Sequence, residues 1–122
     1  MREIFKYFPD LDKFFEALRE ARVIVLDYKK KIALGHFEDY DSFLDVQRMK
    51  WSCACLNDIY RTLPCKHIRL LAFLYSNWKK LPLAYYRVAK DLKLIVDRFV
   101  LRVWKGKIYG KLVPDLKLDV QS

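Results

Sequence analysis

The sequence predicts a protein of the α+β class, in which a small antiparallel sheet packs with helices. Two runs rich in β-branched and apolar residues, 21–28 and 32–37, are typical of strands, and consecutive lysines separate them. Residues 9–20 carry apolar side chains three and four positions apart, which is the pattern of an amphipathic helix. A second apolar helix is expected at residues 68–75.

The N-terminal helix has a well-defined apolar stripe. Leu11, Phe14, Phe15 and Leu18 recur at i, i+3, i+4 and i+7, and Asp10 is placed to cap the first turn. We expect this stripe to face the protein core rather than a partner protein.

Two charged segments next to the predicted strands have simple interpretations. The lysines at 29–31 suit an exposed hairpin turn, with contact to a phosphate as the alternative. Residues 38–41 are expected to form a solvated acidic loop, because no second carboxylate cluster supports a metal site there. His36 stands alone in a strand-like run and is expected to be structural.

Length and composition favour one folded domain spanning residues 1–122, since 53% of the residues are hydrophobic and no linker-like stretch occurs. No secretory signal is recognisable at the N-terminus. The longest apolar run, residues 70–75, is far shorter than the ~20 residues that span a bilayer. We therefore expect a cytoplasmic protein, or a nuclear one in a eukaryote, with no membrane partner and no secretion.

The positive charge is concentrated in the second part of the chain. Residues 1–46 contain 8 basic and 10 acidic side chains, whereas residues 47–122 contain 16 basic and 5 acidic ones. Such a field attracts polyanions such as DNA or RNA. The alternative is a charge that only keeps a small protein soluble.

All three cysteines and one of the two histidines lie within fifteen residues, as Cys53, Cys55, Cys65 and His67. An odd number of cysteines cannot form a closed disulfide framework within one chain. Thiolate and imidazole are the ligands that zinc prefers, and four of them fill its tetrahedron. The sequence therefore predicts one structural Zn²⁺.

The spacing of the four residues suits a common site. On a strand ending near Cys55, side chains two apart point the same way, so Cys53 and Cys55 can face one ion. A turn is expected at Asn57 and Asp58. Cys65 would lie at the entry of the following helix and His67 in its first turn.

Two other interpretations of the cysteines are possible. They can be small buried apolar residues, or one of them can be a redox or nucleophilic cysteine. The second needs a base and an orienting acid, and the sequence places neither. A site with four protein ligands also leaves no open position for catalysis, so we expect no enzyme activity.

The pattern C-x-C followed by C-x-H resembles the SWIM-type zinc finger. Trp51 matches the aromatic residue before C-x-C in many members, and the run from Pro64 to His67 is similar to the family's. The resemblance covers about residues 21–76 and implies a DNA-binding or protein-interaction module. Residues 77–122 have no counterpart in it and are expected to form a basic helix and hairpin extension.

Within this extension, Leu83–Leu92 is expected to be a helix, with Arg87 and Asp91 spaced to pair at i, i+4. Residues 98–104 and 107–113 predict a β-hairpin that turns near Gly106. Basic residues alternate there with aromatic rings, as on nucleic-acid surfaces. A twisted hairpin whose lysines protect an exposed edge is an equal alternative.

The leading hypothesis is a zinc-binding protein that binds nucleic acid, with DNA favoured, and no small-molecule substrate. Its candidate contact residues are Lys50, Arg61, Lys66, Arg69, Lys79, Lys80, Arg102, Lys105, Lys107 and Lys111. The alternative is an adaptor of a DNA-repair, recombination or regulatory complex that binds a protein partner through Trp51, Trp78 or Trp104.

Overall fold

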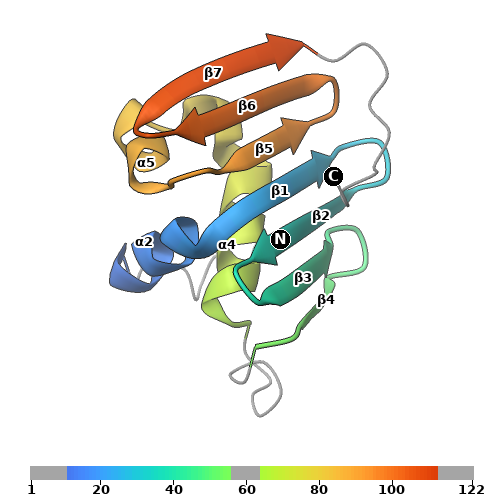
Figure 1. The fold of residues 1–122 in the computed structure, drawn as a ribbon. Helices are drawn as coiled ribbons and strands as arrows, with labels where there is room; N and C mark the ends of the chain where they lie inside the picture. Colours follow the sequence, from blue (N-terminus) through green and yellow to red (C-terminus); the bar gives the residue numbers. More distant parts are fainter. Residues whose placement is uncertain (1–10, 56–63, 113–122) are drawn as a thin grey trace.

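A seven-stranded sheet is the centre of the computed structural model, which describes residues 11–55 and 64–112. The strand order is β4-β3-β2-β1-β5-β6-β7, and all neighbours are antiparallel except β1 and β5 (Figure 1). The strands are β1 (Ala21–Asp27), β2 (Ile32–Phe37), β3 (Tyr40–Asp45), β4 (Lys50–Cys53), β5 (Lys93–Val96), β6 (Phe99–Trp104) and β7 (Lys107–Leu112).

Three helices and a short 3-10 turn complete the described elements: α2 (Leu11–Glu20), α4 (Lys66–Asn77), η1 (Trp78–Lys80) and α5 (Leu83–Val88). Helix α4 crosses one face of the sheet and contacts β1, β2, β3 and β4, while α2 packs on α4 (Figure 1). The α+β class is thus confirmed. Among the described residues, no helix is both long and apolar enough to cross a membrane.

The predicted stripe of α2 faces the core at three of its four positions. Phe14 and Leu18 are buried, and Phe15 packs half-buried against them, whereas Leu11 is 57% exposed at the start of the helix. The ring of Phe14 meets that of Phe73 in α4 edge to face, with centroids 5.2 Å apart. The stripe therefore joins α2 to α4.

The close approach of α4 to the sheet depends on Gly35 in β2. A Cβ atom added at this glycine would lie 3.0 Å from Cδ2 of Leu71 and would overlap the ring of Phe37. Leu71 and Phe37 are both fully buried. The absence of a side chain at Gly35 thus allows α4 to close over the middle of the sheet.

The predicted turn at residues 29–31 is confirmed, and the β1–β2 hairpin connection includes residue 28 as well. Asp27 holds it, because its Oδ1 accepts hydrogen bonds from the backbone N–H groups of Lys29 and Lys30 at 3.0 Å. The acidic loop is shorter than predicted. Only residues 38 and 39 form the turn, and Tyr40 begins β3.

The C-terminal helix was predicted too long. Helix α5 ends at Val88, and Asp91 has a φ of 60°, so the helical pairing of Arg87 with Asp91 is wrong. Leu92 is buried and leads directly into β5, which lies parallel to β1. Strand β5 is nearly all buried, as parallel strands are, and such short apolar runs show no clear helical or strand period.

The predicted hairpin turning near Gly106 is confirmed as β6 and β7, and Gly106 has a φ of 77°. It belongs to the same sheet as the rest of the chain, because β5 links it to β1. The segment expected as an appended extension therefore supplies three of the seven strands. The predicted turn at Asn57 and Asp58 lies outside the described residues.

Candidate metal centre

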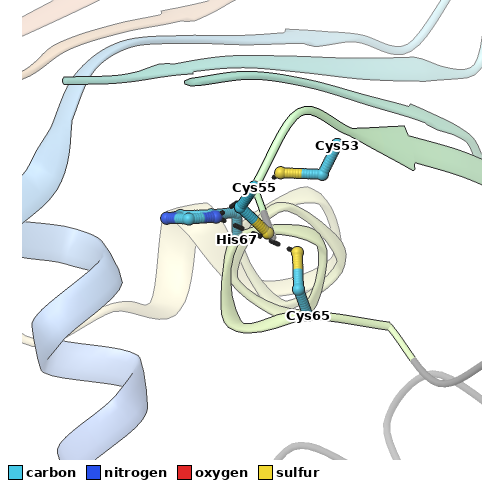
Figure 2. A group of neighbouring side chains, drawn as sticks. All are labelled: Cys53, Cys55, Cys65 and His67. Carbon is cyan, nitrogen blue, oxygen red and sulfur yellow. Dashed lines mark hydrogen bonds between the residues drawn. The ribbon is translucent and has the colours of Figure 1, made fainter. Parts of the chain in front are cut away.

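The four predicted ligands come from two places in the fold. Cys53 is the last residue of β4, and Cys55 follows it by two positions. Cys65 is the N-cap of α4, in an extended conformation with φ −73° and ψ 174°, and His67 is in the first turn of that helix. Figure 2 shows the four side chains converging on one point between these segments.

The route by which Cys55 reaches this point differs from the prediction. Strand β4 ends at Cys53, and the chain bends at residues 54 and 55. The backbone N–H of Ala54 donates a 3.2 Å hydrogen bond to the carbonyl oxygen of Asp41 in β3, which fixes the bend. The bend, and not strand alternation, turns Cys55 toward the other ligands.

The distances between donor atoms fit a tetrahedral metal ion. All four donor atoms lie within 4.8 Å of one another. Nδ1 of His67 is 3.5 Å from Sγ of Cys53 and 3.9 Å from Sγ of Cys65. Tetrahedral zinc, with Zn–S of about 2.3 Å and Zn–N of about 2.0 Å, separates such donors by about 3.5–3.8 Å. The cluster can therefore hold one metal ion through Nδ1 of His67.

The cluster is closed to solvent. The exposed fractions of Cys53, Cys55, Cys65 and His67 are 8%, 5%, 6% and 1%. The ring of His67 packs against that of Phe37, with centroids 4.6 Å apart. A substrate has no direct access to the sulfur atoms in this arrangement, as is usual for structural metal sites.

The surroundings of Cys53 and Cys65 shift the pKa values of these two thiols in opposite directions. Hydrogen-bonding contacts with Cys65, His67 and Ser42 lower the pKa of Cys53, although its burial acts in the opposite direction. The hydrogen bond to Cys53 and burial raise the pKa of Cys65. Metal binding requires thiolates, so a divalent cation in the cluster would displace protons from the sulfurs.

A chain of charged groups supports His67 on the side away from the sulfurs. Oε1 of Glu20, at the end of α2, lies 3.6 Å from Nε2 of His67. Nζ of Lys66 lies 2.7 Å from Oε2 of Glu20 and 2.5 Å from Oε1 of Glu16. When Nδ1 binds a metal, the proton of the ring is on Nε2 and points toward this carboxylate.

Sequence reasoning missed Glu20 and Glu16, because they lie far from the finger in the sequence and face it only across the α2–α4 packing. The signal that was available is weak: both residues are acidic and lie four positions apart on α2, so they share one helix face. A second missed contact is Ser42, whose Oγ lies 3.0 Å from Sγ of Cys53.

The predicted basic residues do not share one surface. Lys50 is exposed on β4, at the opposite edge of the sheet from β7. Lys79 and Lys80 are exposed in η1, and Arg61 lies outside the described residues.

Two predicted basic residues have partners close to the metal cluster. Lys66 pairs with Glu16 and Glu20, and these hydrogen bonds raise its pKa although burial opposes them. Nε of Arg69 donates to the carbonyl oxygen of Pro64 at 2.8 Å. Lys66 therefore stabilises the packing of α2 on α4 instead of extending a cationic surface.

The remaining predicted cations gather on the C-terminal strands. Residues paired across a β-ladder project to the same face, and Arg102 pairs with Tyr109, Trp104 with Lys107, and Val100 with Lys111. Lys105 lies in the turn, with Nζ 4.7 Å from the ring centroid of Trp104. Lys93, which sequence reasoning missed, pairs with Arg102 and therefore lies on the same face as these cations. We call this set the basic face: Lys93, Arg102, Lys107 and Lys111.

Comparison with known proteins adds no assignment: no family model, no curated protein and no solved structure matches this chain. A functional proposal therefore depends on the metal cluster and the basic face.

Proposed function

We propose that this chain is a zinc-binding module of the SWIM-finger kind that binds nucleic acid, DNA first of all, through the basic face. In this proposal Cys53, Cys55, Cys65 and His67 hold one structural zinc ion. The ion joins the β3–β4 side of the sheet to the start of α4 and so stabilises the fold.

The donor chemistry supports zinc. Three sulfurs and one imidazole nitrogen make a set of soft and borderline ligands, with no carboxylate in the cluster that would favour Mg²⁺ or Ca²⁺. The distances of 3.5 and 3.9 Å from Nδ1 of His67 to two sulfurs suit a tetrahedral ion. The C-x-C and C-x-H spacing is that of the SWIM pattern.

The observation that carries the nucleic-acid proposal is the basic face. Arg102, Lys107 and Lys111 are exposed and lie on adjacent strands, with Trp104 and Tyr109 between them. Cations at strand spacing attract phosphates, and their neutralisation releases counterions from the polyanion. The net positive charge of residues 47–122 also attracts a polyanion.

A fluorescence-polarisation titration tests the proposal. We expect the zinc-loaded protein to bind labelled DNA with an affinity that falls steeply between 50 and 200 mM salt, conditions at which phosphate contacts weaken by orders of magnitude. Replacing Arg102, Lys107 and Lys111 together by Gln should weaken binding and reduce the slope of log K against log salt by about 0.9 for each phosphate that is no longer neutralised.

The matched control replaces the three lysines of the β1–β2 turn, residues 29–31, by Gln. It removes the same charge from exposed positions outside the basic face. Equal losses in both triple variants would show that net charge alone binds the polyanion. No binding at low salt, with one zinc ion per chain, would refute the nucleic-acid proposal.

A second candidate is a protein-interaction adaptor, and the exposure of Trp104 is the observation that favours it. Trp104 is 54% exposed, whereas Trp78 packs on Phe99 with ring centroids 5.6 Å apart and Trp51 packs against the core. Exposed aromatic rings are common centres of protein interfaces. A complex with a protein partner that is insensitive to salt and lost in Trp104→Ala would favour this function.

A further inference from the structure

A groove of about 840 Å³ opens next to the basic face. It runs across the start of β1, the start of β5, and the β6–β7 hairpin, and Lys93, Arg102, Trp104 and Tyr109 contribute to its lining. Its volume is within the range of about 300–1,000 Å³ that ligand sites occupy.

The strand register places the main side chains of the groove in one row. Val23 pairs with Lys93, Lys93 with Arg102, and Arg102 with Tyr109, so all four project to the same face of the sheet. Trp104 is two residues beyond Arg102 on β6 and shares this face. The row therefore combines two cations with two aromatic rings at its outer end.

The rings are unusually accessible for their size. Trp104 is 54% exposed and Tyr109 is 50% exposed. Leaving such large apolar surface in water is unfavourable, and exposed aromatic surface beside cations is a feature of binding sites. Nζ of Lys105 lies 4.7 Å from the centroid of Trp104, which adds positive charge next to the ring.

The cations of the groove are available for an anionic ligand. Neither Lys93 nor Arg102 makes a side-chain hydrogen bond or ion pair within the part of the chain that the structure describes. Arg22 also lines the groove, but its guanidinium lies 3.5 Å from Glu38 and donates to nearby carbonyl oxygens. Among the described residues of the lining, Asp91 is the single carboxylate. With Arg22 paired to Glu38, Lys93 and Arg102 are the two cations of this described lining that can meet an anionic ligand.

We propose that this groove binds a single-stranded polynucleotide, with bases stacked on Trp104 and Tyr109 and phosphates held by Lys93 and Arg102. The inference rests on the proposed nucleic-acid function and specifies its ligand. In a duplex the flat faces of the bases are already stacked, so exposed rings on a sheet gain little from it. An unpaired strand offers both base faces and phosphates, which are the two groups that this groove complements.

The experiment uses the full zinc-loaded chain and three labelled probes: a 15-nucleotide dT strand, a 15-nucleotide U strand and a 15-base-pair DNA duplex. We expect tighter binding to the single strands than to the duplex, and the two single-stranded probes separate a DNA ligand from an RNA ligand. Trp104→Ala should weaken single-strand binding by roughly 5- to 150-fold, the range for the loss of one stacked base. Trp104→Phe should retain most of the affinity because it keeps a ring.

Phe43→Ala is the matched control. Phe43 is another exposed aromatic residue on the same face of the sheet, 37% exposed on β3, but it is not part of the groove lining. It should leave single-strand binding unchanged. Far-UV circular dichroism and zinc content should show that all variants are folded.

The outcomes separate the two proposals. If Trp104→Ala and Tyr109→Ala leave salt-dependent binding unchanged, the stacking groove is overturned but the nucleic-acid function is not. Tighter binding to the duplex than to the single strands would have the same consequence. Failure of all three probes to bind at low salt would overturn both.

Discussion

Oε1 of Glu20 lies 3.6 Å from Nε2 of His67, so the last residue of α2 faces the far side of the metal-cluster histidine. The His67 side chain is buried, with 2% exposed, and that of Glu20 is partly buried, with 17% exposed. Carboxylates in this position fix the orientation and protonation of a metal-binding imidazole and raise its basicity. The relationship connects the N-terminal helix to the metal centre through one side chain.

Glu20→Gln should therefore lower the affinity for zinc by about 10- to 100-fold, because the amide keeps the shape but loses the charge that polarises His67. Glu16→Gln is the matched control: Glu16 also pairs with Lys66, but the described contacts of its carboxylate do not include His67. Competition with a chromophoric zinc chelator measures both affinities. Equal affinities in the two variants would assign Glu20 a purely packing role.

His67→Ala should abolish zinc binding and greatly reduce or abolish folding. Structural zinc contributes on the order of 10 kcal/mol or more in small domains, which is comparable to their whole stability. His36→Ala is the control, because His36 is exposed and its Nδ1 pairs with Asp41 at 2.6 Å, on the surface. Thermal unfolding and zinc content check this. A His67→Ala protein that melts like wild type would contradict it.

Gly35→Ala should destabilise the protein by about 1–3 kcal/mol, as overpacking of a tight core does. The added methyl group would lie against Leu71 of α4 and overlap the ring of Phe37. Urea unfolding of the zinc-loaded protein measures the change. Unaltered stability would mean that α4 can move away from the sheet without loss of packing.

Alkaline pH should destabilise the protein partly through Tyr86. Burial raises the pKa of this phenol to about 12, against about 10 in the unfolded chain. The neutral form is thus favoured by folding, so this contribution is complete below about pH 10 and is lost as pH rises toward 12. The hydroxyl also donates a 2.8 Å hydrogen bond to the carbonyl oxygen of Trp78.

Tyr86→Phe removes both effects, so wild type should exceed this variant in stability at pH 8, by about 0.5–1.5 kcal/mol for one hydrogen bond. The difference should shrink or reverse at pH 11, where only the wild-type residue can ionise. Urea unfolding at the two pH values measures it. A difference that does not change with pH would show that Tyr86 ionises equally easily in both states.

The metal cluster could be predicted from the sequence because it depends on residue type and short spacing. Three cysteines and a histidine within fifteen residues favour metal binding over other uses of these side chains. The helix entry at Cys65 follows from local geometry. The hairpin around Gly106 was predictable for the same reason, since an alternating pattern and a turn residue are local signals.

The parallel pairing of β5 with β1 was not predictable in this way. It joins residues about seventy positions apart, and a four-residue apolar strand has no distinct period. Lys93 and Glu20 could not be predicted as site residues for the same reason. The role of Lys93 depends on the register between β5 and β6, and that of Glu20 on the packing of α2 against α4. Long-range contacts, and not propensities, decide these features.

Zinc-edge X-ray absorption of the purified full chain, together with its metal content, tests the metal centre most directly. We predict one zinc ion per chain, with three sulfur neighbours at about 2.3 Å and one nitrogen neighbour at about 2.0 Å. A folded protein without metal, or a zinc ion surrounded only by nitrogen and oxygen atoms, would contradict this prediction.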